Sequence, residues 1–150
     1  MIAIGNDHVG FELKEAVIEV LKAHNLEYKD FGAYSPDRAN YPVYGQKVAM
    51  AVASGECDRG ILLCGTGVGI SIAANKVKGV RCVVCSEPYS AKLAKEHNNA
   101  NILSMGARVV GPELAKMIVE SWLTAEFQGG RHAERVAMLD EIENGVILSE

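Results

Sequence analysis

The sequence Cys64-Gly65-Thr66-Gly67-Val68-Gly69 places three glycines within five residues, directly after a short apolar run. Glycine tolerates backbone conformations that other residues avoid, so such a turn leaves backbone N–H groups free to point at an anion. A tight turn without a ligand needs only one glycine. We therefore interpret residues 65–69 as an anion-binding turn, called here the glycine cradle. It is not a Walker loop, because it lacks Gly-Lys-Ser/Thr. It is not a dinucleotide fingerprint either, because Ile70 stands where the fingerprint needs a small residue.

Cys64 lies directly before the glycine cradle. Free N–H groups and a following helix N-terminus favour the thiolate over the thiol, and a thiolate can serve as a base or a nucleophile. A lone cysteine at such a place is more commonly just the last buried residue of its strand. The neighbouring groups favour the chemical role here.

Two histidine motifs offer further acid–base groups. Asp7-His8 follows the first apolar run, where Asp7 can also cap a helix and leave His8 exposed. His97-Asn98 ends a helical pattern, where a histidine is commonly only a partner of the helix dipole. Each motif taken alone is compatible with a structural role.

Arg131 and Arg135 are spaced i,i+4 and therefore share one face of a predicted helix. Two guanidinium groups so placed can grip a phosphate. Alternatively they belong to a solvated face on which Arg135 pairs with Glu134 or Asp140. Together with the histidines, the cysteine and the cradle, the arginines indicate acid–base chemistry on an anion, without any metal or nucleotide motif.

Short apolar runs bounded by turn residues alternate with helical patterns along the chain, and this predicts a parallel sheet. Five strands are expected, at Ile2 to Asn6, Glu27 to Phe31, Gly60 to Cys64, Val80 to Cys85 and Ile102 to Met105. Amphipathic helices are expected at Phe11 to His24, Val43 to Ala53, Glu113 to Phe127 and Arg131 to Glu143, with Pro88 and Pro112 suited to first helical turns. The pattern predicts a doubly wound, Rossmann-like α/β domain with helices on both faces of a five-stranded sheet.

Ligands of open α/β sheets lie beyond the carboxyl ends of the strands. Asp7-His8, the glycine cradle, Ser86-Glu87 and Gly106-Ala107-Arg108 follow the first, third, fourth and fifth strands. We expect them to gather at one edge of the sheet. The long irregular stretch from Gly32 to Pro42 is the connection most suited to carry function.

Gly129-Gly130 breaks the chain before a final helical tail, residues 131–150, that the sheet does not need. Val136, Leu139 and Ile142 are spaced for one face of this tail. We expect that face to pack on a partner subunit.

Composition excludes several classes of protein. The 150 residues carry a net charge of -4 with 15 scattered Lys and Arg, so a nucleic-acid partner is not expected. Apolar runs are too short to cross a membrane, and the first residues lack the features of a signal peptide. Four cysteines in such a chain are expected to stay reduced, and Cys82-Val-Val-Cys85 has the pattern of a strand. We expect one soluble, cytoplasmic domain spanning residues 1–150.

The sequence resembles the type B ribose-5-phosphate isomerases, whose wider family includes allose-6-phosphate and galactose-6-phosphate isomerases. The resemblance covers essentially the whole chain. It rests on Asn6-Asp7-His8-Val9-Gly10, the run from Cys64 to Lys76, Cys85-Ser86-Glu87-Pro88, His97-Asn98-Asn99 and Gly129-Gly130-Arg131-His132.

The resemblance implies interconversion of ribose 5-phosphate and ribulose 5-phosphate, a step of the pentose phosphate pathway, through an enediolate and without metal or cofactor. Moving a hydrogen between C1 and C2 needs a base and donors for the developing oxyanion. Cys64 is the expected base, since Ile70 occupies the position where some relatives carry a glutamate. The expected donors are the N–H groups of Gly65, Thr66, Gly67, Val68 and Gly69, with the Thr66 hydroxyl exchanging protons.

The remaining roles also follow from the resemblance. His97 with Asp7 is expected to open the sugar ring, and Asn98 to bind a hydroxyl. His8, Arg108, Arg131 and Arg135 are expected to hold the phosphate. Arg131 and Arg135 are expected to act across the interface of a homodimer, possibly within a tetramer, in which the tail of one chain completes the site of the other.

Two other functions remain open on sequence alone. A hexose 6-phosphate differs from a pentose phosphate by one hydroxymethylene, and the same polar groups would serve both. A galactose-specific subunit normally works in an unlike pair, whereas this chain holds a complete set of groups. A non-catalytic phosphosugar-binding module is disfavoured by the presence of Cys64, Thr66 and His97 together.

Overall fold

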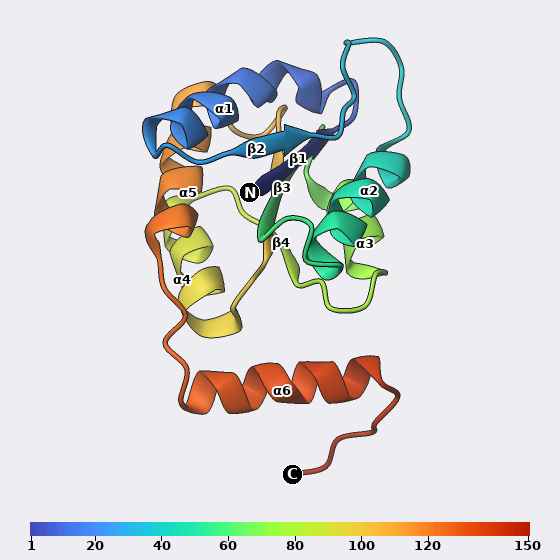
Figure 1. The fold of residues 1–150 in the computed structure, drawn as a ribbon, viewed down its shortest axis with the longest axis vertical. Coiled ribbons are helices and arrows are strands. Elements are labelled where there is room, and N and C mark those ends of the chain that lie inside the picture. Colours follow the sequence, from blue (N-terminus) through green and yellow to red (C-terminus); the bar gives the residue numbers. More distant parts are fainter.

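A computed structural model describes residues 1–150 and contains a parallel sheet of five strands (Figure 1). The strands are β1 Ile2–Asn6, β2 Tyr28–Asp30, β3 Arg59–Cys64, β4 Cys82–Val84 and β5 Ile102–Gly106. Their order across the sheet is β2-β1-β3-β5-β4. The predicted five-stranded parallel sheet is confirmed, and the two edge strands β2 and β4 are shorter than expected.

Six α-helices and one 3₁₀ turn connect and follow these strands. They are η1 Gly10–Leu13, α1 Lys14–Ala23, α2 Tyr41–Ala53, α3 Val68–Asn75, α4 Pro88–Asn98, α5 Pro112–Thr124 and α6 Arg131–Glu143. Pro88 and Pro112 each begin a helix, as predicted. The first helical segment opens with the 3₁₀ turn η1, and α2 begins two residues before the expected Val43.

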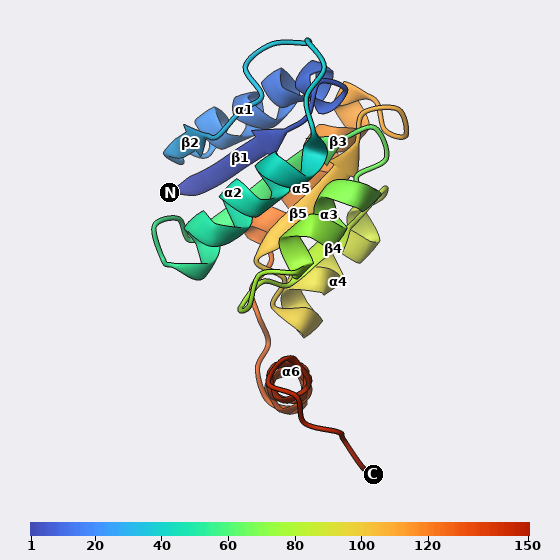
Figure 2. The same cartoon turned by 90° about the vertical axis from the view of Figure 1, so that its right-hand side faces the viewer.

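Alternate residues of each strand pack on opposite faces of the sheet. Ile61 and Leu63 of β3 join the core beneath α1, α4 and α5, whereas Leu62 and Cys64 join the core beneath α2 and α3. Figures 1 and 2 show these two groups of helices on the two sides of the sheet. The doubly wound architecture is therefore confirmed. None of the helices has the length and apolar character to cross a bilayer.

The prediction that the fifth helix reaches Phe127 is wrong, because α5 ends at Thr124. The chain becomes extended at Ala125 and then runs beside α4, where the Gln128 N–H donates to the Glu96 carbonyl at 3.0 Å. This bond holds the linker that leads into α6. Figure 1 shows α6 at one end of the molecule, below α4, on which it packs.

The strand order reverses direction between β1 and β3, because β2 follows β1 toward one edge of the sheet and β3, β5 and β4 lie toward the other. Such a reversal opens a crevice beyond the carboxyl ends of the two strands on either side of it. In this chain those ends are followed by Asp7-His8 and by the glycine cradle. The topology therefore brings two of the predicted motifs to one place.

Lys14 is a buried cation that fastens the loop at this edge of the sheet. Its Nζ donates to both carboxylate oxygens of Asp30, at 2.9 and 3.1 Å, and to the Ala33 carbonyl at 2.7 Å. The same carbonyl accepts a hydrogen bond from the side-chain amide of Asn6, which precedes Asp7. Lys14 thus ties the start of the loop 32–40 to the end of β1.

Lys14→Met should lower the free energy of unfolding by about 3 kcal/mol, because it leaves the Asp30 carboxylate without its cation in a poorly hydrated place. Urea denaturation at fixed protein concentration measures this change. Lys29→Met is the matched control, since the Lys29–Glu56 pair is about half exposed on both sides and should contribute under about 1 kcal/mol. Equal losses for the two variants would contradict the interpretation.

Candidate active site

A cavity of about 400 Å³ opens at the carboxyl ends of β1, β3 and β5. It gathers acidic, basic, thiol and hydroxyl groups from four separate segments of the chain. The lining residues are Asp7, His8, Val9, Tyr41, Cys64, Gly65, Thr66, Gly69 and Arg108. The structure therefore brings together seven of the residues that the sequence singled out.

The glycine cradle takes a shape that only glycine permits at two positions. Gly67 has φ +81°, and a Cβ there would lie 2.8 Å from the carbonyl carbon of Met105. A Cβ on Gly69 would lie 2.6 Å from the Tyr41 ring. Close packing on β5 and on Tyr41 thus explains these two glycines without reference to a ligand.

The cradle also leaves donors unused. The N–H groups of Gly65, Thr66 and Gly69 make no hydrogen bond within the chain. Gly67 and Val68 differ, because the Gly67 N–H donates to Cys64 Sγ at 3.1 Å and the Val68 N–H donates to Thr66 Oγ1 at 3.2 Å. Three free donors beside a helix N-terminus are suited to an oxyanion.

Cys64 lies at the inner end of the cavity with its sulfur beneath the cradle. The hydrogen bond from the Gly67 N–H fixes the position of the Cys64 sulfur at 3.1 Å from that nitrogen. Of the four cysteines, Cys64 alone lines this cavity.

The other three thiols are placed unfavourably for ionisation. Burial raises the pKa of the Cys85 thiol to about 11, and burial also raises the pKa values of Cys57 and Cys82. These thiols therefore stay protonated at neutral pH. None of the four cysteines forms a disulfide.

Asp7 and His8 are held by backbone groups on opposite sides of the cavity mouth. Asp7 Oδ1 accepts hydrogen bonds from the N–H groups of Val9 and Gly10, at 2.9 and 2.8 Å, so Asp7 does cap the first helical segment. Its Oδ2 makes no bond within the chain and remains available to a ligand. His8 Nδ1 lies 3.2 Å from both the N–H and the carbonyl oxygen of Ala39, which anchors the ring to the loop 32–40.

Arg108 reaches the same cavity from the end of β5. Its N–H donates to the Gly65 carbonyl at 3.0 Å, and the Ala107 N–H donates to the Cys64 carbonyl at 2.8 Å. These bonds continue the pairing of β3 and β5 beyond the strands. They place a guanidinium group beside the glycine cradle.

The remaining predicted residues lie at the opposite edge of the sheet. His97 and Asn98 end α4, and the carbonyl of Asn98 accepts a hydrogen bond from Arg81, which directly precedes β4. A strand such as β5 is about 16 Å long at 3.3 Å per residue. His97 therefore lies too far from Asp7 and Cys64 to act with them within one chain, as do Arg131 and Arg135 at the start of α6.

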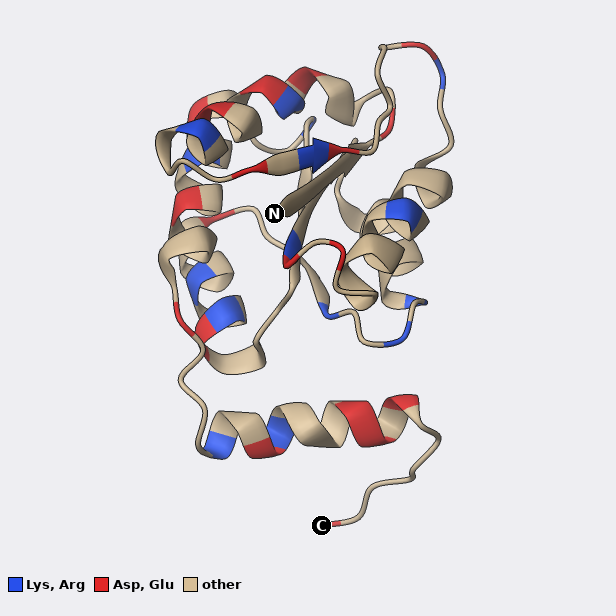
Figure 3. Cartoon of the chain, in the orientation of Figure 1, with Lys and Arg blue, Asp and Glu red and all other residues tan.

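Arg131 and Arg135 form no ion pair, so the alternative in which Arg135 pairs with Glu134 or Asp140 is wrong. Asp140 instead approaches Arg81 at 4.0 Å, and the Glu143 carboxylate accepts the Gly79 N–H at 3.0 and 3.1 Å. Figure 3 shows two basic segments in the first half of α6 with an acidic one, Glu134, between them, and further acidic segments toward its end. The two arginines therefore lie at the end of α6 where the helix dipole is positive, with Glu134 as the one acidic residue of that first turn.

Sequence reasoning missed Tyr41 and Val9, which line the cavity. Tyr41 gave no signal except its position at the end of the long loop. The expectation that Val136 packs on a partner subunit is wrong, because Val136 is buried against its own chain. Leu139 and Ile142 are about half exposed. Val136 faces inward because α6 packs on α4.

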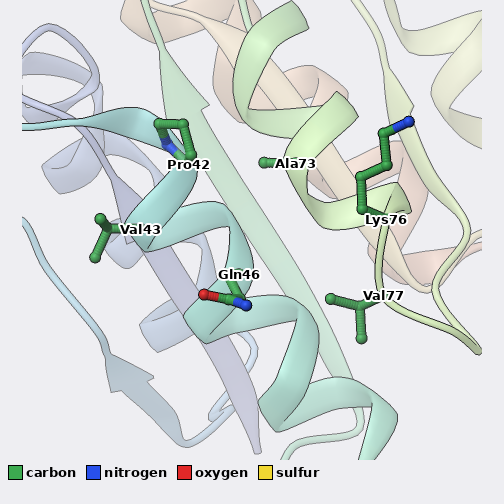
Figure 4. A pocket seen from close by; sticks show the side chains of 6 residues that line it. All are labelled: Pro42, Val43, Gln46, Ala73, Lys76 and Val77. Carbon is green, nitrogen blue, oxygen red and sulfur yellow. The ribbon is translucent and has the colours of Figure 1, made fainter.

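A second groove, of about 370 Å³, lies between α2 and α3 (Figure 4). Gln46 and Lys76 are its only residues with side-chain nitrogen or oxygen, beside Pro42, Val43, Ala73 and Val77. It holds no carboxylate, imidazole or thiol and offers no means of acid–base catalysis. Nowhere in the chain do three His, Cys, Asp or Glu side chains gather as a set of metal ligands.

The fold and the cavity define an α/β protein built for acid–base chemistry on a small anionic ligand at the switch point of its sheet. The sequence profile of the Ribose/Galactose Isomerase family matches residues 2–139. This chain belongs to that family.

Three relatives illustrate the similarity. The chain is 58% identical over 142 residues to Ribose-5-phosphate isomerase B of Escherichia coli (strain K12), with 95% of each chain covered. The solved structure of Clostridium thermocellum Ribose-5-Phosphate Isomerase B matches with a TM-score of 0.94 and 56% identity, covering 96% of this chain and 97% of that one. Ribose-5-phosphate Isomerase B from Mycoplasma genitalium, solved with bound ribulose-5-phosphate, matches with a TM-score of 0.90 and 38% identity over 97% of each chain.

Iodoacetamide at pH 8 should alkylate Cys64 at least about 10-fold faster than the other cysteines, because the raised pKa values of those thiols keep them protonated. Ribulose 5-phosphate should slow the reaction at Cys64 alone. Mass spectrometry of the digested protein measures both rates. Faster labelling at Cys57 or Cys85, or protection of every cysteine equally, would contradict the assignment of Cys64.

Proposed function

We propose that this protein interconverts ribose 5-phosphate and ribulose 5-phosphate through an enediolate. The observation that carries the proposal is the placement of the Cys64 thiol, hydrogen-bonded by a backbone N–H, beneath a turn with three unused N–H donors. A base and an oxyanion site so close together meet the two requirements of an aldose–ketose isomerisation. The names of the similar proteins agree with this reaction.

The proton transfers follow from the positions of these groups. The Cys64 thiolate removes the C2 proton of the open-chain aldehyde, the C1–C2 double bond forms, and negative charge develops on O1. The free N–H groups of the glycine cradle stabilise that oxygen. The Thr66 hydroxyl relays the O2 proton to O1, C2 becomes a carbonyl, and the Cys64 thiol returns its proton to C1. Cys64 ends as the thiolate it began as.

The site needs a second copy of the chain. His97 and Asn98 are proposed to serve ring opening and hydroxyl binding, yet they lie one strand length from the cavity that holds Asp7 and Cys64. A symmetric dimer removes this separation. In it, each chain places its His97 and Asn98 over the cavity of the other chain. An isologous dimer forms two such composite sites.

The exposed apolar surface supports this pairing. His97 and Asn98 lie in a groove of about 420 Å³ whose walls include Val84 and Tyr89. Val68 and Ile72 of α3 lie exposed beside the cavity of Cys64. When His97 of one chain meets the cavity of its partner, these two apolar surfaces face each other, and contact removes both from water.

The phosphate is proposed to bind at arginines that form no ion pair within their own chain. Arg131 and Arg135 of one chain would meet His8 and Arg108 of the other across the interface. Guanidinium groups bind phosphate oxygens in pairs of hydrogen bonds. Holding the phosphate end of the sugar orients C1 and C2 at Cys64. A working thiolate needs reducing surroundings, and we therefore place the reaction in the cytoplasm.

Purified protein should convert ribose 5-phosphate to ribulose 5-phosphate in a coupled assay, and a chelator in the buffer should leave the rate unchanged. Allose 6-phosphate should be converted at least about 10-fold less efficiently, as measured by kcat/KM, because the cavity must accommodate one more hydroxymethylene. The Cys64→Ala variant is the control and should lose at least about 100-fold in kcat. Preference for the hexose phosphate would overturn the substrate assignment, and tight phosphosugar binding without turnover would identify a binding module.

Mixing two inactive variants tests the shared site. Cys64→Ala and Arg135→Ala chains should each be nearly inactive, but half of the randomly exchanged dimers are mixed and hold one intact site of two. About a quarter of the unaltered activity should therefore return.

Cys64→Ala mixed with Thr66→Ala is the matched control, because both changes lie in the same half of the site and no mixed dimer has an intact one. Recovery in the control, or no recovery in the first mixture after exchange has been demonstrated by mass spectrometry, would contradict the shared site.

A further inference from the structure

Two imidazole rings from distant parts of the sequence lie face to face at the amino edge of the sheet. His97 belongs to the last turn of α4 and His132 to the first turn of α6. Their ring centroids are 4.1 Å apart and their planes differ by 6°. A parallel stack restrains the plane of each ring and leaves the ring nitrogens at the outer edges, where a ligand can meet them.

The backbone holds the two rings in register. The Gln128 N–H donates to the carbonyl of Glu96, the residue before His97, and the Gln128 side chain contacts the Glu96 carboxylate at 3.3 Å. The His132 N–H then donates to the Gly129 carbonyl at 3.0 Å. The linker between α5 and α6 is thus hydrogen-bonded next to His97 and next to His132.

The charges around the stack keep one ring neutral. Partial burial lowers the pKa of His132, and nearby His97, Arg131 and Arg135 lower this pKa further. Two positively charged rings in face-to-face contact would repel each other. With His132 uncharged at neutral pH, the stack avoids that repulsion.

We propose that His132 is a positioning residue for sugar-ring opening, which fixes the plane of the His97 ring by stacking on it. The inference rests on the proposed function, because only a cyclic sugar phosphate needs the step. In that step the O1 proton leaves, the C1–O4 bond breaks and O4 gains a proton. His97 and Asp7 of the partner chain's cavity exchange these protons, so the orientation of the His97 ring affects the rate directly.

Ribulose 5-phosphate allows the step to be separated from the rest of the reaction. Its O5 carries the phosphate, so it cannot close a furanose ring, and exchange of its C1 proton in D₂O reports on Cys64 and the cradle alone. His132→Ala should lower kcat for ribose 5-phosphate at least about 10-fold with KM changed less than about 3-fold. The same variant should keep C1 exchange, followed by NMR, within about 2-fold. Retained exchange also shows that the variant is folded.

His132→Phe tests the stack itself, because it keeps a flat ring and removes the nitrogens. It should retain at least about half of the unaltered kcat. His24→Ala is the matched control, since His24 pairs with Glu120 on α5, away from both histidines, and should leave both rates unchanged.

The outcomes separate the two levels of the argument. If the unaltered protein neither converts ribose 5-phosphate nor exchanges the C1 proton, the proposed function is wrong and the role of His132 falls with it. If the unaltered protein does both and His132→Ala matches it, the positioning role alone is overturned. An equal rise of KM in the Ala and Phe variants would instead show that His132 binds the phosphate directly, and an equal loss of exchange and conversion would show that it supports the site in general.

Discussion

The contact between the glycine cradle and the end of β5 is the constraint on which the catalytic half of the site depends. A Cβ on Gly106 would lie 2.6 Å from the carbonyl carbon of Thr66, so the two backbones touch where side chains would ordinarily stand. Ser104 Oγ donates to the Gly67 carbonyl at 2.6 Å and fixes the turn from below. Because the turn is held so low, the Gly67 N–H reaches Cys64 Sγ, and one contact positions both the thiol and the free N–H groups of the cradle.

The parallel topology then divides the remaining groups between two edges of the sheet. Helices that connect parallel strands run back to the amino edge, so residues at the end of α4 lie a strand length from residues that follow β3. His97 and Cys64 are each well placed on their own elements but cannot act on one substrate within one chain. In the proposed symmetric dimer, one interface would bring the amino edge of each chain to the carboxyl edge of the other, and so would complete two sites. The apolar surface exposed beside both half-sites is consistent with that arrangement.

Local charge, not net charge, prepares the protein for an anion. The chain carries a net charge of -4, yet Arg131 and Arg135 begin a helix whose dipole already makes that end positive. Toward the other end of α6, Asp140 approaches Arg81 and Glu143 accepts the Gly79 N–H, and neither arginine forms an ion pair within the chain. The tail is thereby held in place by its acidic end while its basic end stays available.

Local patterns were sufficient to predict β1 and α6 with their observed bounds, because hydrophobic periodicity and the flanking turn residues act over a few positions. They also identified Cys64 and the cradle, since glycine spacing is itself a local signal. Tertiary structure alone decided the order of the strands, the inclusion of Tyr41 in the cavity and the inward face of Val136. It also decided that His97 lies far from Cys64 and stacks on His132. These features depend on which elements pack together across long sequence separations, and the composition of a short segment carries no information about its distant neighbours.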